Sequence, residues 1–220
     1  MGISIFMYAD DLLILSPSVT YLQKLIRLVE VELTHLDMPI NTGKSMCIRI
    51  GHRYNSKCAD ITDYNGVIIP WVISCRYLGI YILSGHVFKC DFSYSKQRLF
   101  KCFNAIFGKI GRCASSDVIV QLLKTKCFPI FLYALEACPV NTTDNKSFEF
   151  ALFRLLAKIF GTTSNEMISE CRLAFNICPI SLLINFRKIN FLKRFIASEN
   201  QLCKTFFRNA NHELSILNHF

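Results

Sequence analysis

Short apolar runs separated by polar turns occupy the first part of the sequence, and longer helical patterns occupy the rest. Ile3–Met7 and Leu12–Leu15 are apolar runs of strand length, and only Tyr8-Ala9-Asp10-Asp11 separates them. Two such runs joined by so few residues predict an antiparallel hairpin. From Val19 to Asp37 apolar residues recur at helical spacing. We expect this amphipathic helix to cover the back of the sheet.

Further strands are predicted between residues 46 and 82. Met46–Ile50 alternates as an extended segment that can return antiparallel to the hairpin, and residues 51–64 are polar enough for a loop. Val67–Ile69 and Cys75–Ile82 have strand composition. Gly79 inside the second of these suggests a bulge or a close approach of a ligand to the backbone.

Helical patterns follow from residue 93 to the end of the chain. Ser93–Glu136 predicts two helices with a break at residues 111–116, where Ser116-Asp117 offers capping chemistry for the second. Polar residues Asn141–Lys146 then mark a boundary. Further helices are expected at residues 148–160, 165–176 and 180–207.

These patterns predict an α+β protein. Residues 1–90 should form a small antiparallel sheet with one covering helix, residues 91–140 a helical hairpin, and residues 141–220 a helical extension.

Composition and net charge predict the kind of partner that the chain binds. The 220 residues are 52% hydrophobic and carry a net charge of +9, with a pI near 9.0. A basic protein attracts polyanions, either nucleic acid or an anionic membrane, and nucleic acid is our prediction. No apolar stretch approaches the roughly 18 residues that a membrane span needs. The N-terminus lacks a basic leader and places Asp10-Asp11 in its apolar segment, unlike a signal peptide. We therefore predict an intracellular protein, cytoplasmic or nuclear, with no membrane partner.

Eleven cysteines are spread at wide intervals and contain no Cys-x-x-Cys pair. Structural zinc sites usually need such close pairs, so the spacing predicts reduced, mostly buried thiols.

The expected helical hairpin is strongly basic, because Asp117 is the sole acid between Ser95 and Pro129. Such a face suits phosphate backbones, although a merely solubilising surface is the alternative. The candidate nucleic-acid-binding residues are Lys96, Lys101, Lys109, Arg112, Lys124 and Lys126.

Asp10 and Asp11 carry the sharpest chemical hypothesis. Neighbouring residues on a strand point to opposite faces, so two adjacent carboxylates approach one site only where the chain turns. Carboxylates are hard oxygen ligands suited to Mg²⁺, and nucleotidyl transfer uses two such ions about 3.5–4 Å apart. The alternative is a solvated Asp-Asp turn.

Tyr8-Ala9-Asp10-Asp11 between apolar strands resembles the metal-binding motif of reverse transcriptases. The order of later segments resembles the non-LTR, LINE-type retrotransposon branch of that family. Asn41–Ser45 is similar to its Asn-x-x-Lys-Ser/Thr segment, Arg76–Ile80 to its Tyr-Leu-Gly primer-grip strand, and Leu122–Glu136 to its thumb helix and the segment beyond.

The resemblance implies the last part of a palm, a thumb and a C-terminal extension of an RNA-directed DNA polymerase. It implies Mg²⁺ as the cofactor, held by Asp10 as the principal ligand and Asp11 as a secondary one. It places Lys44 beside the leaving pyrophosphate, as a charge stabiliser and general acid. The primer would lie against Tyr77, Leu78 and Gly79, with an RNA template and a DNA primer as partners.

One departure limits this reading. The family has a third catalytic Asp on a strand far upstream, whereas here Met1 stands seven residues before Tyr8. Asp60, Asp63 and Asp91 do not replace it, because they lie in polar turns or at a helix start and on the wrong side in chain order. Three hypotheses remain: a polymerase fragment that is inactive alone, a nucleic-acid-binding module, and an enzyme completed by a partner chain. The uncovered edge of the first strand also predicts self-association.

Overall fold

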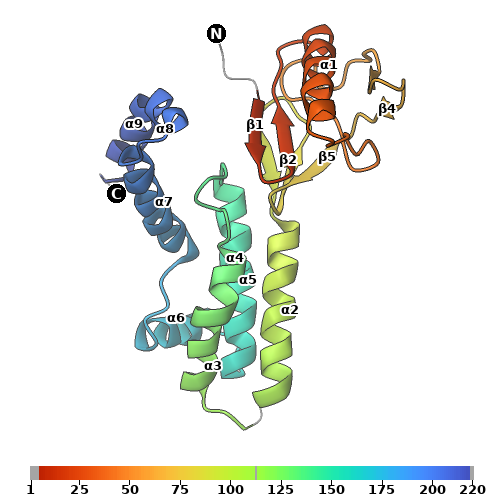
Figure 1. Ribbon diagram of the computed structural model, residues 1–220. Coiled ribbons are helices and arrows are strands. Elements are labelled where there is room, and N and C mark those ends of the chain that lie inside the picture. Colours follow the sequence, from red (N-terminus) through yellow and green to blue (C-terminus); the bar gives the residue numbers. More distant parts are fainter. Residues whose placement is uncertain (1–4, 112, 219–220) are drawn as a thin grey trace. The chain divides into compact units, whose positions relative to one another are not determined.

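The structure, a computed structural model, describes residues 5–111 and 113–218 (Figure 1). The described chain is an α+β protein with small antiparallel sheets and a majority of helix, which confirms the predicted fold class at that level. It divides into two compact units, residues 1–90 and 91–220. Residues 91–140 and 141–220, expected as separate parts, belong to the same unit.

The first unit begins with the predicted hairpin. Strand β1 (Ile5–Tyr8) pairs antiparallel with β2 (Asp11–Ile14), and the register places Ile5 opposite Ile14 and Tyr8 opposite Asp11. This confirms the hairpin expected from the two apolar runs. The start of the first run, Ile3 and Ser4, lies outside the described residues.

Helix α1 (Val19–His35) follows, as its apolar spacing predicted. The Ser18 side chain caps its N-terminus by accepting a hydrogen bond from the Tyr21 backbone N–H at 3.2 Å. At its C-terminus Asp37 adopts a positive φ of 54°, and the N–H of Met38 reaches back to the carbonyl of Leu33 at 3.0 Å. This is a Schellman arrangement, which ends the helix at His35, four residues before Pro39.

The remaining strands form small sheets, where the sequence predicted one small sheet. Strand β3 (Ile61–Thr62) pairs with β4 (Ile68–Ile69), and β5 (Ser74–Tyr77), β6 (Ile80–Leu83) and β7 (Lys89–Asp91) form a second group. Strand β3 lies within the segment expected to be a loop. The prediction of a single strand at Cys75–Ile82 was wrong. The chain reverses at Leu78-Gly79 and pairs β5 antiparallel with β6.

The prediction that Met46–Ile50 returns antiparallel along the hairpin was also wrong. The segment instead makes isolated parallel bridges, Cys47 with Trp71 and Ile50 with Gly85. The Cys47 amide donates to the Pro70 carbonyl at 2.9 Å, and the Cys47 carbonyl accepts from Val72 at 2.8 Å. Alternation predicted an extended backbone, but it carried no information about which strand would be the partner.

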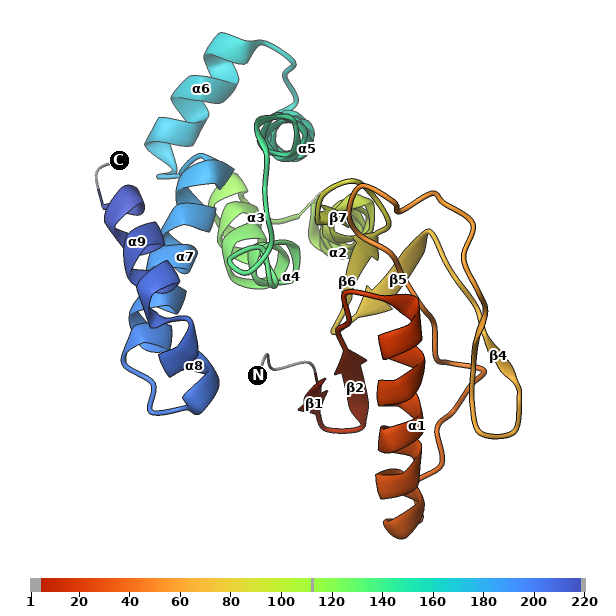
Figure 2. The same cartoon turned by 90° about the horizontal axis from the view of Figure 1, so that it is seen from above.

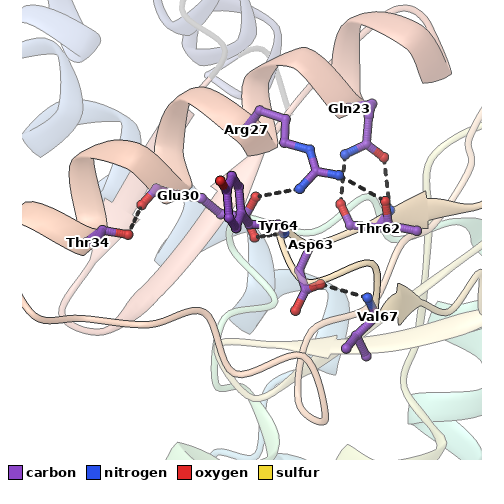
Figure 3. Close-up of polar contacts among 8 residues, drawn as sticks. All are labelled: Gln23, Arg27, Glu30, Thr34, Thr62, Asp63, Tyr64 and Val67. Atoms are coloured by element: carbon purple, nitrogen blue, oxygen red, sulfur yellow. Dashed lines mark hydrogen bonds and ion pairs between the residues drawn. The ribbon is translucent and has the colours of Figure 1, made fainter.

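A compact polar and apolar interface joins α1 to β3, and Figure 3 shows its polar part. The Gln23 side-chain amide donates to the Thr62 carbonyl at 2.7 Å and accepts from the Thr62 N–H at 2.9 Å. Arg27 donates to the Thr62 hydroxyl at 3.2 Å, and Glu30 accepts from the Tyr64 N–H at 2.8 Å. Beside it lies an apolar cluster of the buried residues Ile26, Cys47, Ile61 and Ile69.

The second unit starts with helix α2 (Ser93–Ile110) and a second helical segment, as predicted. That segment comprises α3 (Ser116–Leu122), the π-helical turn η1 (Leu123–Cys127) and α4 (Phe128–Phe131). The Phe128 N–H donates to the Leu123 carbonyl, five residues back. Pro129 has no N–H to donate, which favours a widened turn at this point. The N-cap is Ser115 without a side-chain cap bond, so the cap predicted at Ser116-Asp117 was wrong.

Helix α5 (Thr142–Phe160) begins six residues before the predicted Phe148. Asn141 and Asp144 form a capping box, so the polar stretch expected as a boundary loop is the start of the helix. After it come α6 (Asn165–Ala174), α7 (Ile180–Ile196), α8 (Gln201–Thr205) and α9 (Phe207–Leu217). The long helix expected at residues 180–207 is therefore broken. Helices α8 and α9 turn back along α7 (Figures 1 and 2).

Burial differs sharply between the two units. In the second, α5 supplies the fully buried Phe148, Leu152 and Leu156, and Phe148 makes edge-to-face contacts with Phe92 and Phe131 at centroid distances of 5.4 and 5.3 Å. In the first, few large apolar side chains are buried and many are exposed, including Met7 at 72% and Leu28 at 63%. The first unit therefore exposes more large apolar side chains than the second.

Candidate functional site

A tight turn at the tip of the β1–β2 hairpin holds the two candidate catalytic carboxylates. Tyr8 and Asp11 pair across the strands, which leaves Ala9 and Asp10 as the two central residues of the turn. Ala9 has a positive φ of 53°, whereas Asp10 is not among the positive-φ residues. A positive φ at the first central residue alone is the pattern of a type II′ turn, whose twist matches that of the flanking strands.

This turn brings Asp10 and Asp11 together at an exposed tip. Both residues are exposed, with Asp10 in the turn and Asp11 at the first position of β2. Asp11 projects from the same face of the hairpin as its partner Tyr8. Ile14 projects from the opposite face and packs beside the apolar cluster under α1. The core-facing side chains thus fix which face of the hairpin carries Asp11.

The chemistry of this donor set fits Mg²⁺. Mg²⁺ is commonly held by one or two carboxylates, with water and substrate phosphates completing its octahedral shell. Asp10 and Asp11 supply two carboxylates of that kind, and their exposed position leaves room for phosphate oxygens. Within residues 5–111 and 113–218, no group of three or more His, Cys, Asp or Glu side chains forms a fuller cluster.

Of the other acids considered in the sequence, Asp60 is exposed in a loop, and Asp63 and Asp91 have structural roles. Asp63 is buried, and its carboxylate accepts from the Val67 N–H at 2.7 Å, which braces the β3–β4 turn (Figure 3). Asp91 accepts from the Ser93 N–H at 2.8 Å at the start of α2.

Lys44 lies on an exposed turn that Asn41 organises. The Lys44 N–H donates to the Asn41 carbonyl at 3.1 Å and to the Asn41 side-chain oxygen at 3.2 Å, and the Ser45 hydroxyl donates to the same carbonyl at 2.9 Å. Asn41 and Ser45 therefore set the backbone of this turn, which leaves the Lys44 side chain in solvent. Among the described residues, no ion pair joins Lys44 to Asp10 or Asp11.

Tyr77, Leu78 and Gly79 form the end of β5 and the turn that follows it. Leu78 and Gly79 have positive φ values of 46° and 85°, the pattern of a type I′ hairpin turn. The bulge that Gly79 suggested is therefore a turn in which glycine accommodates the left-handed backbone. Leu78 is 38% exposed at this second hairpin tip, and β6 begins at the buried Ile80.

The six candidate nucleic-acid-binding residues fall into different environments. Lys101 and Lys109 are exposed on α2, and Lys126 is exposed in η1. Lys96 donates to the Ser147 hydroxyl at 2.7 Å, and Lys124 donates to the Phe175 carbonyl at 2.6 Å, so both half-buried ammonium groups are engaged inside the unit. Arg112 lies outside the described residues.

Helix α5 supplies basic residues that the sequence reasoning missed. Lys146, Arg154 and Lys158 are exposed along α5, and Arg154 and Lys158, four residues apart, lie on one face of the helix. Arg154 lies over the Phe100 ring at 5.8 Å, and Lys158 lies over the Phe107 ring at 5.0 Å. Lys158 also donates to Asn104 of α2 at 2.9 Å. The repeat of basic residues along this helix was the signal that would have found them.

These exposed basic residues belong to two neighbouring helices, α2 and α5. Helix α2 contains no acidic residue. The acids of α5 are engaged elsewhere, since Asp144 belongs to the capping box and Glu149 pairs with Arg172 at 3.0 Å. We call this surface the α2–α5 basic face. It comprises Lys101 and Lys109 of α2 with Lys146, Arg154 and Lys158 of α5.

Comparisons with known proteins found no match. The chain matches none of the protein-family models, curated proteins or solved structures with which it was compared. In the described part of the chain, no helix combines the length and apolarity that crossing a bilayer requires.

Proposed function

We propose that this chain is part of an RNA-directed DNA polymerase of the LINE type and that its hairpin tip belongs to the metal-binding site of that enzyme. The carrying observation is the β1–β2 turn, which gathers Asp10 and Asp11 at one exposed tip. The exposed apolar surface of the first unit supports the proposal, because a polymerase palm is a larger structure in which such surface would be covered.

The roles of the residues follow from their chemistry. Asp10 and Asp11 would hold Mg²⁺, which when bound activates the attacking hydroxyl and stabilises the leaving pyrophosphate. Lys44, on its exposed turn, would contribute positive charge toward the triphosphate and would donate a proton to the departing group. Tyr77, Leu78 and Gly79 would present the β5–β6 turn to the primer.

Catalysis by this chain alone is not expected. Positioning and charge neutralisation of an incoming triphosphate require the third carboxylate and the fingers that the family resemblance implies. Primer extension on an RNA template with Mg²⁺ or Mn²⁺ should therefore give no incorporation. Incorporation that Asp10→Ala abolishes would contradict this expectation and favour the alternative of an enzyme completed by a partner chain.

Metal binding at the tip is the direct test of the proposal. Paramagnetic Mn²⁺, added with a deoxynucleoside triphosphate, should broaden the amide resonances of residues 9–12 selectively. The double substitution D10N/D11N should abolish this broadening. As a matched control, D60N changes an exposed loop aspartate of the same unit and should leave the effect intact. Equal broadening in the wild type and D10N/D11N would refute the proposed metal site.

A second function, nucleic-acid binding without catalysis, is favoured by the α2–α5 basic face. Its exposed cations lie on adjacent helices with few acids between them, and such surfaces attract phosphate backbones. Aromatic rings beneath Arg154 and Lys158 support the cations from the protein side. Binding through this face should show little sequence preference, because phosphate contacts carry no direct sequence information.

Charge reversal distinguishes this function from a solubilising surface. K101E/K109E should weaken binding of an RNA–DNA duplex at least tenfold and flatten its salt dependence, because phosphate contacts release counterions. K24E/K57E makes the same change in net charge on exposed lysines of the first unit and should have a much smaller effect. Equal affinities and salt slopes for both variants would refute a role for this face.

A further inference from the structure

Two histidines of the first unit, distant in sequence, lie side by side. The Nε2 atom of His86 is 2.6 Å from the Nδ1 atom of His52, and the ring centroids are 4.1 Å apart with the ring planes at 83°. Both residues are exposed. At this distance one nitrogen donates and the other accepts, so a lone pair of one ring points at the other ring.

The backbone holds the two histidines together independently of their side chains. Ile50 and Gly85 form a parallel bridge, in which the Gly51 N–H donates to the Gly85 carbonyl at 2.9 Å and the Gly85 N–H donates to the Arg49 carbonyl at 3.3 Å. The Ser84 hydroxyl adds a hydrogen bond to the Arg49 carbonyl at 2.8 Å. These bonds join the two segments immediately before each histidine, so the imidazoles are gathered by the fold.

We infer that His52 and His86 form a binding site for one divalent transition-metal ion of the zinc type. Imidazole nitrogen is a preferred ligand of Zn²⁺ and of neighbouring first-row ions, whereas Mg²⁺ prefers oxygen. Bond lengths of about 2.0–2.1 Å at a tetrahedral ion require the two nitrogens to lie about 3.3 Å apart. The rings must therefore separate by about 0.7 Å, a change that the torsions of two exposed side chains supply.

The exchange of the hydrogen bond for a metal ion balances in protons. Each neutral imidazole carries one N–H. For both facing nitrogens to bind the ion, His52 carries its proton on Nε2 and His86 carries its proton on Nδ1. One ring changes tautomer and no net proton is released. The ion then bridges the two bonded segments, and water molecules fill its remaining positions.

This site is separate from the proposed function, because it uses neither the hairpin carboxylates nor the α2–α5 basic face. It was also missed in the sequence, where the two histidines are 34 residues apart and lack a metal-binding spacing.

Titration of the full chain with ZnCl₂ while recording histidine nitrogen resonances by NMR tests the site directly. Zinc should shift Nδ1 of His52 and Nε2 of His86 saturably, and MgCl₂ at the same concentrations should leave both unchanged. The H52N and H86N variants should each lose at least tenfold in zinc affinity by calorimetry. H35N, the same change at an exposed histidine of the same unit, should retain it.

The chain has eleven cysteines, and cobalt separates their contribution from that of imidazole. Co²⁺ bound by thiolate gives an intense sulfur-to-metal charge-transfer band, whereas Co²⁺ bound by imidazole and water does not. The site requires Co²⁺ binding that lacks this band and disappears in H52N. Unmoved His52 and His86 resonances, or H52N and H86N affinities equal to that of H35N, would show that the pair is only a hydrogen bond. Circular dichroism of each variant verifies that the fold is retained.

Discussion

Asp11 lies directly across the hairpin from Tyr8, so the second carboxylate of the candidate site and the preceding aromatic ring project from one face of the β1–β2 ribbon. The opposite face carries Ile14, which packs beside the buried cluster of the first unit. The orientation of the candidate site therefore depends on the register of the hairpin. A slip of one residue would turn Asp11 toward the core.

The turn residue Ala9 should be sensitive to side-chain shape. A positive φ costs an L-residue about 1–2 kcal/mol, and a branched β-carbon adds crowding. We expect Ala9→Gly to leave stability within about 1 kcal/mol of the wild type. We expect Ala9→Val to lower hydrogen-exchange protection in β1 and β2 several-fold. Equal protection in both variants would show that the turn does not have this backbone conformation.

Gln23 should anchor the β3–β4 hairpin to α1. Its side-chain amide makes both hydrogen bonds with the backbone of Thr62, at 2.7 and 2.9 Å, as a neighbouring strand would. Gln23→Ala leaves two partly buried backbone groups without these partners, and we expect a loss of about 1–3 kcal/mol in the free energy of unfolding of the first unit. Lys24→Ala, at the exposed next position of α1, is the matched control and should cost less than about 0.5 kcal/mol.

Two buried thiols should make the protein sensitive to alkali. Burial, together with the adjacent Cys102 thiol 3.5 Å away, raises the pKa of Cys127 to about 12, and burial raises the pKa of Cys47 to about 11. The unfolded thiols have pKa values near 8.5. Above that pH the unfolded state loses these protons first, so the stabilisation present at neutral pH is lost as pH rises toward 11–12.

Denaturation measured between pH 7 and pH 11 tests this linkage. The free energy of unfolding should fall as pH rises above about 8.5, and the fall should be shallower in a Cys47→Ala variant. At neutral pH iodoacetamide should modify exposed Cys113 and Cys178 of the folded chain well before Cys127. Rapid modification of Cys127 would contradict the buried, protonated thiol.

The outer edge of β1 should promote association between chains. In the described residues β1 pairs with β2 alone, and Ile5 and Met7 are exposed on it. Such an apolar edge recruits further strands. We expect concentration-dependent self-association by analytical ultracentrifugation, reduced by Ile5→Lys/Met7→Lys. Leu173→Lys, at a similarly exposed position in the second unit, should not reduce it.

A fragment of residues 91–220 should associate less than the full chain. Their core of α2 to α7 is extensively buried and is built from helices near one another in sequence. We expect this fragment to remain monomeric and helical at concentrations where the full chain associates. A monomeric full chain whose β1 and β2 amides are strongly protected would contradict the exposed-edge prediction.

The sequence by itself determined the elements whose signals are local. Alternating apolar runs around Asp10-Asp11 predicted the hairpin, and helical spacing predicted α1 and the start of α2. These predictions succeeded because period and turn chemistry depend only on neighbouring residues. The reading of Asp10 and Asp11 as metal ligands also came from the sequence and stays a prediction.

Only the tertiary structure decided which distant segments meet. It paired Ile50 with Gly85, brought His52 to His86, and placed Arg154 and Lys158 beside α2. It also turned Leu78-Gly79 from an expected strand interior into a hairpin turn. Strand composition is the same on either side of a reversal, and long-range pairing is selected by the packing of whole elements. Residue spacing along the chain therefore left these relationships open.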